Sequence, residues 1–169
     1  ASTDIHDPEA DITMTLEADF SAYSIRDTFF KDGLFYILHN GASVDQLITF
    51  DGDGYTEIGR VDIARPLTVE SQTSAELFVD ASGDAYILYH YTGQAMLWLV
   101  SIIGGVSVNH GAVPNTVPGW VGTTYFRFAV DKGLLIVAIG EGSINPQVLY
   151  WSLGSISINT VPLSTIVED

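Results

Sequence analysis

The chain has 169 residues, no cysteine, and a formal net charge of −15 from 21 acidic and 6 basic side chains. This charge disfavours nucleic acid and anionic membrane surfaces as partners, because both are bound by clusters of Lys and Arg. The lack of cysteine excludes disulfides and thiolate metal sites, and no apolar run reaches the roughly 18 residues that a membrane helix needs.

The charge is distributed unevenly along the chain. Residues 1–84 contain 17 acidic and 4 basic side chains, whereas the charges of residues 85–167 cancel. The second half is rich in Val, Ile, Leu, Trp and Gly, a composition that is unusual for a surface in water. We therefore expect the first half to face water and the second half to contact other protein subunits.

Residues 1–22 are predicted to form an acidic N-terminal arm with one short strand. Within the arm, Ile12, Met14 and Leu16 alternate with threonines, which is typical of a strand. Residues 23–169 are predicted to form a single β domain that follows the arm.

The β domain repeats one pattern three times at a spacing of 50 residues. In each repeat one glycine precedes an apolar run and a second glycine precedes an alternating segment. The first set is Gly33, Gly83 and Gly133, and the second set is Gly54, Gly104 and Gly154. A period of this size indicates one supersecondary unit used three times. The repeats span about residues 23–64, 74–112 and 123–163.

Each repeat is predicted to contain four short antiparallel strands joined by tight turns. The predicted strands are residues 24–30, 34–39, 46–50 and 55–61, then 75–79, 85–91, 95–102 and 106–109, then 125–130, 134–139, 147–152 and 155–159. In each repeat the second strand is apolar on both faces, so we expect both sides of its sheet to be covered. Stacked four-stranded sheets provide such cover, which favours an all-β fold of three propeller-like repeats.

Residues 29–38, 46–51 and 54–59 carry a resemblance to a known repeat. They read Phe-Phe-Lys-Asp-Gly-Leu-Phe-Tyr-Ile-Leu, Gln-Leu-Ile-Thr-Phe-Asp and Gly-Tyr-Thr-Glu-Ile-Gly, and this order resembles a kelch-type β-propeller blade. The resemblance extends over residues 24–160. It implies three blades of a propeller, in which case the chain is part of a longer ring or pairs with a second chain. Similar blades occur in phage tail and nozzle proteins.

A β-trefoil is the alternative fold, because it also uses three repeats of four strands. Trefoil lectins that resemble the ricin family carry a Gln-x-Trp signature in each repeat. Here Gln46, Gln94 and Gln147 are not followed by Trp two residues later, and this favours the propeller-like interpretation.

Acidic residues of the turn at 51–57 are the weak candidates for a metal site. Asp51, Asp53 and Glu57 are clustered carboxylates, the ligands that hard cations prefer. The glycine and glutamate positions of a calcium loop are occupied by Thr56 and Asp62, so we interpret the segment as a hairpin turn. We expect no metal and no cofactor.

Aromatic residues of the second half are the candidates for an interface or a ligand site. They are Trp120, Trp98, Trp151, Tyr91 and Tyr125. Aromatic rings stack on sugars and anchor protein interfaces, although most of them pack in cores. Trp120 follows Pro118 and Gly119 in a predicted loop and is the strongest of the five.

The sequence contains no convergent nucleophile, acid–base pair or metal set, so an enzyme is the least favoured function. We expect a non-enzymatic structural or interaction subunit of a multi-copy assembly, most specifically a virion or phage tail component. Its partners would be protein subunits of the same assembly, and its location the virion or the extracellular space. The alternative is a carbohydrate-binding module that binds a glycan through loop aromatics.

Overall fold

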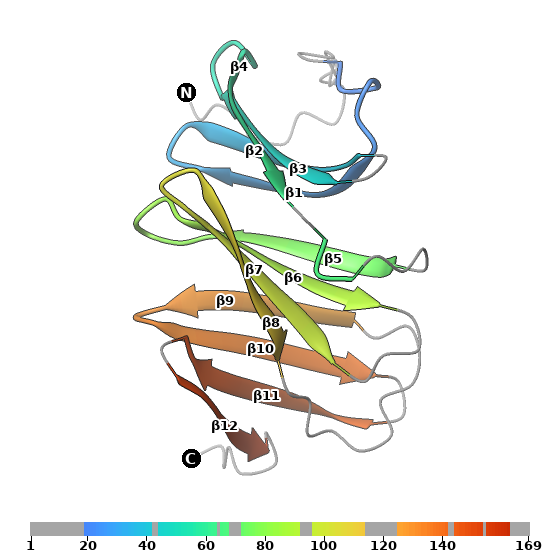
Figure 1. Ribbon diagram of the computed structural model, residues 1–169, viewed down its shortest axis with the longest axis vertical. Helices are drawn as coiled ribbons and strands as arrows, with labels where there is room; N and C mark the ends of the chain where they lie inside the picture. The colour runs from blue at the N-terminus through green and yellow to red at the C-terminus, as the bar shows by residue number, and fades with distance from the viewer. Residues whose placement is uncertain are drawn as a thin grey trace, which may run out of the picture.

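The computed structural model describes residues 19–41, 44–63, 65–67, 72–91, 96–113, 125–141, 144–153 and 155–162. All regular secondary structure in these residues is β-strand (Figure 1). The strands are β1 (Ile25–Lys31), β2 (Leu34–Asn40), β3 (Asp45–Asp51), β4 (Glu57–Ile63), β5 (Gln72–Val79), β6 (Ala85–Tyr91), β7 (Leu97–Ile103), β8 (Val106–Val113), β9 (Tyr125–Asp131), β10 (Leu134–Glu141), β11 (Ile144–Ser152) and β12 (Ser155–Pro162). Among the described residues, no helix is long and apolar enough to cross a membrane. The strand predicted around Met14 lies outside the described residues.

The twelve strands form three antiparallel sheets, each built from one repeat. The first sheet has the order β1-β2-β3-β4, the second β5-β6-β7-β8 and the third β9-β10-β11-β12. The prediction of three four-stranded meanders is therefore confirmed. A β-trefoil closes a barrel by pairing strands of different repeats. No sheet in the described part contains strands of two repeats, so the trefoil alternative is wrong.

Tight turns join the first two strands of the outer sheets. The turns Asp32-Gly33 and Lys132-Gly133 have positive φ at both residues, 52° and 78° in the first and 49° and 75° in the second. This conformation belongs to the two-residue hairpin turn whose twist matches that of the flanking strands. The repeated glycine is therefore explained by backbone geometry, because glycine adopts positive φ without steric cost.

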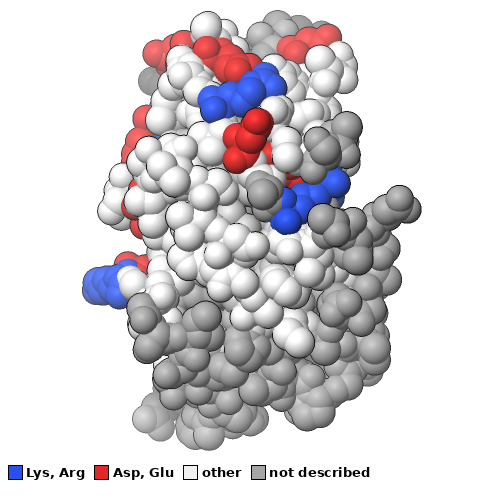
Figure 2. Space-filling view, in the orientation of Figure 1, with Lys and Arg blue, Asp and Glu red and all other residues white. Residues whose placement is uncertain are grey.

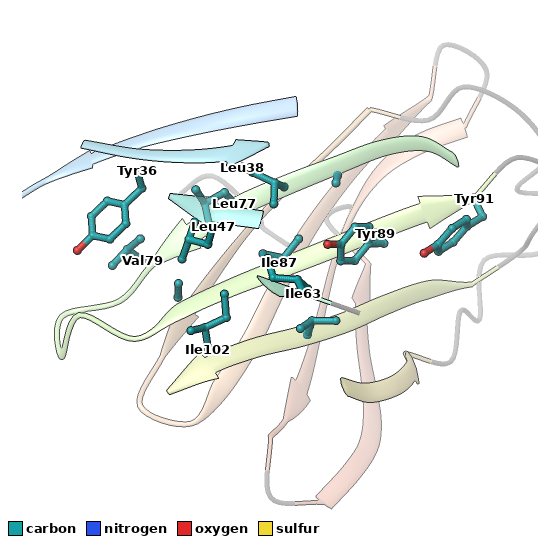
Figure 3. Packing of buried hydrophobic residues seen from close by; sticks show 13 residues of the cluster. Tyr36, Leu38, Leu47, Ile63, Leu77, Val79, Ile87, Tyr89, Tyr91 and Ile102 are labelled. Carbon is teal, nitrogen blue, oxygen red and sulfur yellow. The ribbon is translucent and has the colours of Figure 1, made fainter. Parts of the chain in front are cut away.

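The three sheets are stacked in sequence order, with the first at the top of Figure 1 and the third at the bottom. A first apolar cluster fills the space between the first and second sheets (Figure 3). In this cluster Tyr36 and Leu38 of β2 face Ile87 and Tyr89 of β6. The Asp27 carboxylate adds a polar link, because its Oδ2 accepts the N–H of Leu77 at 2.7 Å. The hydrogen bond gives a partner to a backbone N–H on the open edge of β5, which is an edge strand of the second sheet.

A second apolar cluster fills the space between the second and third sheets. Tyr86 and Leu88 of β6 face this cluster from above, and Leu135 and Val137 of β10 face it from below. Arg127 of β9 pairs with Glu76 of β5 across the same interface. The first strands β1, β5 and β9 contact one another in succession along the stack.

The cover predicted for both faces of each second strand differs between the sheets. Every residue of β6 is buried, as expected for the middle sheet. The back of the first sheet is covered as well, because Phe20 and Tyr23 pack on Ile37 and Phe50. In the third sheet the prediction is wrong within the part of the chain that the structure describes, because Leu134 is 39% exposed and Ala138 is exposed on the face of β10 that points away from the second cluster.

Candidate interaction surface

Three of the five predicted aromatic site residues lie within the described part, and they belong to the apolar clusters. Tyr91 is 0% exposed and Trp151 is 2% exposed. Trp98 is half-buried and packs against the cluster between the first two sheets. Tyr91 and Trp151 therefore present no open face for stacking on a sugar, whereas Trp98 is only partly covered. Trp120 and the side chain of Tyr125 lie outside the described residues.

The weak metal candidates are engaged in a turn and in an ion pair. Oδ1 of Asp51 accepts the N–H groups of Asp53 and Gly54 at 3.0 and 2.6 Å. Both carboxylate oxygens of Glu57 accept from Arg60, at 2.9 and 2.7 Å. The hydrogen bonds from Arg60 lower the pKa of Glu57. In the part of the chain that the structure describes, no group of three or more His, Cys, Asp or Glu residues is placed to hold a metal.

The third sheet presents an apolar face away from the rest of the stack. On β10, Leu135, Val137 and Ile139 point into the second cluster, so the alternating residues point outward. The register adds their neighbours on β9 and β11 to the same face. We call this surface the outer face, and its apolar residues are Leu134, Ile136, Ala138, Ala129, Val148 and Tyr150.

The exposure of the outer face distinguishes it from the interior. Leu134 and Ala138 are exposed, and Ile136 and Tyr150 are half-buried. Sequence reasoning missed this surface, because the apolar pattern of β10 matches that of β2 and β6.

The 50-residue period relates the outer face to the two interfaces inside the stack. Tyr36 and Leu38 of the first sheet pack toward the second sheet. Tyr86 and Leu88 of the second sheet pack toward the third. The equivalent positions of the third sheet are 136 and 138, an isoleucine and an alanine. The outer face is therefore the third copy of a surface that is used twice for sheet-to-sheet packing.

Charge is concentrated at the opposite end of the stack. The charged side chains visible in Figure 2 lie mainly around the first sheet. Within the third sheet, Arg127 lies at the rim of the outer face and is paired with Glu76. Burial raises the pKa of Glu76, the charge of Asp27 raises it further, and Arg127 opposes both effects. By the same register, Arg127 and Asp131 of β9 lie beside Ala138 and Leu134, so the charges of the outer face are at its β9 edge.

A buried ionic cluster in the first sheet was also missed by sequence reasoning. Asp45 is 0% exposed, and its carboxylate lies 3.3 Å from Nε of Arg26 and 3.0 Å from Nη2 of Arg65. Asn40 Oδ1 accepts from the same two guanidinium groups, at 2.6 and 2.7 Å. The cluster ties the strand ends of the first sheet together, which is a structural role.

Comparison with known proteins gives likeness in fold alone. No family model and no curated protein matches the sequence. A protein of unknown function from Bacteroides caccae is 14% identical, with a TM-score of 0.54 over 84% of this chain and 47% of that chain. The exo-β-1,3-galactanase of Phanerochaete chrysosporium, solved with β-1,3-galactotriose, is 11% identical, with a TM-score of 0.52 over 79% of this chain and 36% of that chain. The chain spans less than half of the length of either structure.

Proposed function

We propose that the chain is a non-enzymatic structural subunit of a multi-copy assembly, and that it associates through the outer face of its third sheet. The observation that carries this proposal is the apolar surface around Ile136 and Leu134, on which Leu134 is 39% exposed and no described residue forms a covering layer. Contiguous apolar surface of this kind is typical of protein interfaces. A virion or phage tail component is the most specific form of the proposal, and it rests on the acidic, cysteine-free, β-rich composition.

We infer further that the three sheets are blades of an open, propeller-like arc. Contacts between the first strands β1, β5 and β9 support this arrangement, since propeller blades converge at their inner strands. A ring usually needs four to eight blades, so an arc of three leaves room at the outer face for a further blade or for a second copy.

The occupant that fits the outer face best is the outer face of a second copy. A head-to-tail contact would place the outer face on the back of a neighbour's first sheet. That back is already covered by Phe20, whose ring lies 5.1 Å from that of Phe50 and 5.4 Å from that of Phe35. A two-fold contact uses the same surface on both copies and closes the assembly. It also keeps the two strongly acidic halves apart, because residues 85–167 carry no net charge.

Carbohydrate binding is the alternative function, and only the fold likeness to a galactanase supports it. The burial of Tyr91 and Trp151 argues against their stacking on a sugar. This leaves the half-buried Trp98, and Trp120 and Tyr125, whose side chains lie outside the described residues, as the remaining candidates for that role.

Static light scattering at micromolar concentration tests the proposal. We expect the wild-type chain to have twice the 18.3 kDa mass of one copy, and the Ile136→Lys variant to be a monomer. Val106→Lys is the matched control, because Val106 is 62% exposed on β8 and lies off the outer face. It should associate as the wild type does.

Two results would contradict the proposal. One is a monomeric wild-type chain at every concentration tested, and the other is an Ile136→Lys variant that still associates. Circular dichroism should show that both lysine variants keep the β-sheet signal, since neither residue belongs to an apolar cluster between sheets.

A further inference from the structure

The first strands of the three sheets carry an ionisable side chain at one repeated position. Asp27, Glu76 and Arg127 lie opposite residues 38, 88 and 138, which the 50-residue period relates to one another. In the first two sheets this side chain contacts the following sheet. Asp27 accepts the N–H of Leu77 on the second sheet, and Glu76 pairs with Arg127 on the third. The position therefore forms a polar contact between sheets each time a following sheet is present.

Arg127 occupies this position where the described stack of sheets ends. Its side chain is 79% exposed. Among the described residues its two hydrogen bonds, to Glu76 and to the carbonyl oxygen of Phe126, both use Nη1. A guanidinium group has five N–H donors, so Arg127 can bind a further acceptor beyond the outer face without giving up Glu76.

Strand β9 presents one positive and one negative side chain on the outer face. Side chains alternate along a strand, and Arg127, Ala129 and Asp131 lie beside residues 138, 136 and 134 of β10, which face outward. Ala129 is therefore midway between the two charges. The Asp131 carboxylate is exposed and has no hydrogen bond or ion pair to another described residue.

The row of residues through Ala129 is the centre of this pattern. Ala129 pairs with Ile136, and Ile136 pairs with Tyr150, so the three residues cross the sheet in a line. Two residues away from the row, β10 carries Leu134 on one side and Ala138 on the other. The outer face thus has a large and a small apolar side chain at equal distances from the row, as it has an acidic and a basic side chain on β9.

A two-fold axis along this row makes the outer face complementary to itself. The rotation places each strand antiparallel to its own copy across the interface. Arg127 then lies opposite Asp131 of the second copy, and Leu134 lies opposite Ala138 of the second copy. A two-fold axis along β10 would instead place Leu134 opposite Leu134, and Arg127 opposite the uncharged Val148. Complementary charges fix the register of an interface, and here they favour the axis along the row.

We propose that the outer face pairs with its own copy about the row Ala129, Ile136 and Tyr150, and that Arg127 and Asp131 determine the orientation of the two copies. This inference rests on the association proposed above and adds its geometry. Each dimer contains the contact between Arg127 and Asp131 twice, once on each side of the axis. The contact adds no net charge to the interface, although each chain carries −15.

Charge reversal of Asp131 separates the proposed contact from general electrostatics. Asp131→Arg makes the net charge of −15 less negative by two, which eases the repulsion between copies. The proposal nevertheless predicts weaker association, because the new arginine faces Arg127 at both contacts. We expect the dissociation constant of the dimer, measured by sedimentation equilibrium, to rise roughly tenfold. Asp53→Arg is the matched control, because it makes the same charge change at an exposed turn of the first sheet and should not weaken the dimer.

Mixing two variants provides a rescue that requires the two residues to meet. Arg127→Asp should weaken its own dimer, because a carboxylate then faces Asp131. In an equimolar mixture with Asp131→Arg, both contacts of the mixed dimer join opposite charges. Native mass spectrometry should show the mixed dimer in excess over either parent dimer. Asp131→Arg leaves the pair of Arg127 with Glu76 intact, so the sedimentation experiment decides the question even if Arg127→Asp does not fold.

Cysteine cross-linking tests the direction of the two-fold axis. A short bismaleimide should join Leu134→Cys to Ala138→Cys in a mixture of the two variants, because the two sites face each other across roughly 10 Å between packed sheets. Either variant alone should cross-link poorly, because its two sites are offset by about 13 Å along the strands.

The proposed orientation is overturned if Asp131→Arg associates as tightly as Asp53→Arg, if the folded charge variants form no excess of mixed dimer, or if each cysteine variant cross-links mainly to itself. Any of these results, together with a wild-type dimer that Ile136→Lys disrupts, would refute the orientation and leave association through the outer face in place. A monomeric wild-type chain would refute both.

Discussion

The buried carboxylate of Asp45 offers a sharp test of what holds the first sheet together. Oδ1 of Asp45 accepts from Nε of Arg65 at 3.0 Å, and Oδ2 lies 3.3 Å from Nε of Arg26. The two arginine side chains are only 21% and 16% exposed. Removing the carboxylate charge in Asp45→Asn would leave two poorly hydrated guanidinium groups without their anion.

The expected loss in the free energy of unfolding is about 3 kcal/mol. Breaking a buried ion pair from one side typically costs about 3–5 kcal/mol. The lower end applies here, because both arginines keep hydrogen bonds to Asn40 and Arg65 keeps one to the carbonyl of Gly41. Urea unfolding followed by circular dichroism measures the difference.

Glu57→Gln is the control for this prediction, because it removes one negative charge from an exposed pair with Arg60. Such pairs contribute about 1 kcal/mol or less. The control also accounts for the general relief of repulsion in a chain of net charge −15. If Asp45→Asn costs no more than Glu57→Gln, the cluster does not stabilise the first sheet and our interpretation of it is wrong.

Two further predictions concern a turn and a titrating side chain. Gly83→Ala should lower the free energy of unfolding by about 1–2 kcal/mol through backbone strain alone, because φ is +86° and a Cβ there meets no atom within 4 Å. Gly59→Ala is the control and should cost less, because Gly59 lacks a positive φ. Equal melting temperatures for the two variants would refute the role of backbone strain. Burial and the charge of Asp27 raise the pKa of Glu76 above 4.5, so the folded state binds this proton more tightly than the unfolded state. The stability of the wild type relative to the Glu76→Gln variant should then fall as the pH rises above 4.5 through the folded-state pKa of Glu76. If the relative stability of the wild type instead rises with pH, the ion pair with Arg127 dominates.

Most of the fold follows from local sequence signals. The 50-residue spacing, the turn glycines and the apolar second strands predicted three four-stranded antiparallel sheets, because each signal acts within one hairpin. The largest error in strand length is in β8, predicted at residues 106–109 and observed at Val106–Val113. The run Asn109-His110-Gly111 reads as a loop, whereas a β-bulge lets the strand continue through it.

The sites were less predictable, because they depend on contacts between sheets. Trp98 and Trp151 have the same sequence character as interface aromatics, and only the stacking of sheets shows that Trp151 is interior and that Trp98 is partly covered. The pairing of His110 with Ser101 depends on the bulge in β8, which has no clear signature in the sequence. The outer face was missed because the apolar pattern of residues 134–139 matches that of the second strands in the other two repeats.

The account depends most on the claim that association of two copies covers the outer face. The chain has no cysteine, so Ala138→Cys places a single thiol on that face, and Val108→Cys places one on β8, where Val108 is 43% exposed. The rate of thiol alkylation should fall with increasing protein concentration for Ala138→Cys and stay constant for Val108→Cys. Equal and constant rates for the two variants, at concentrations up to the solubility limit, would contradict the account.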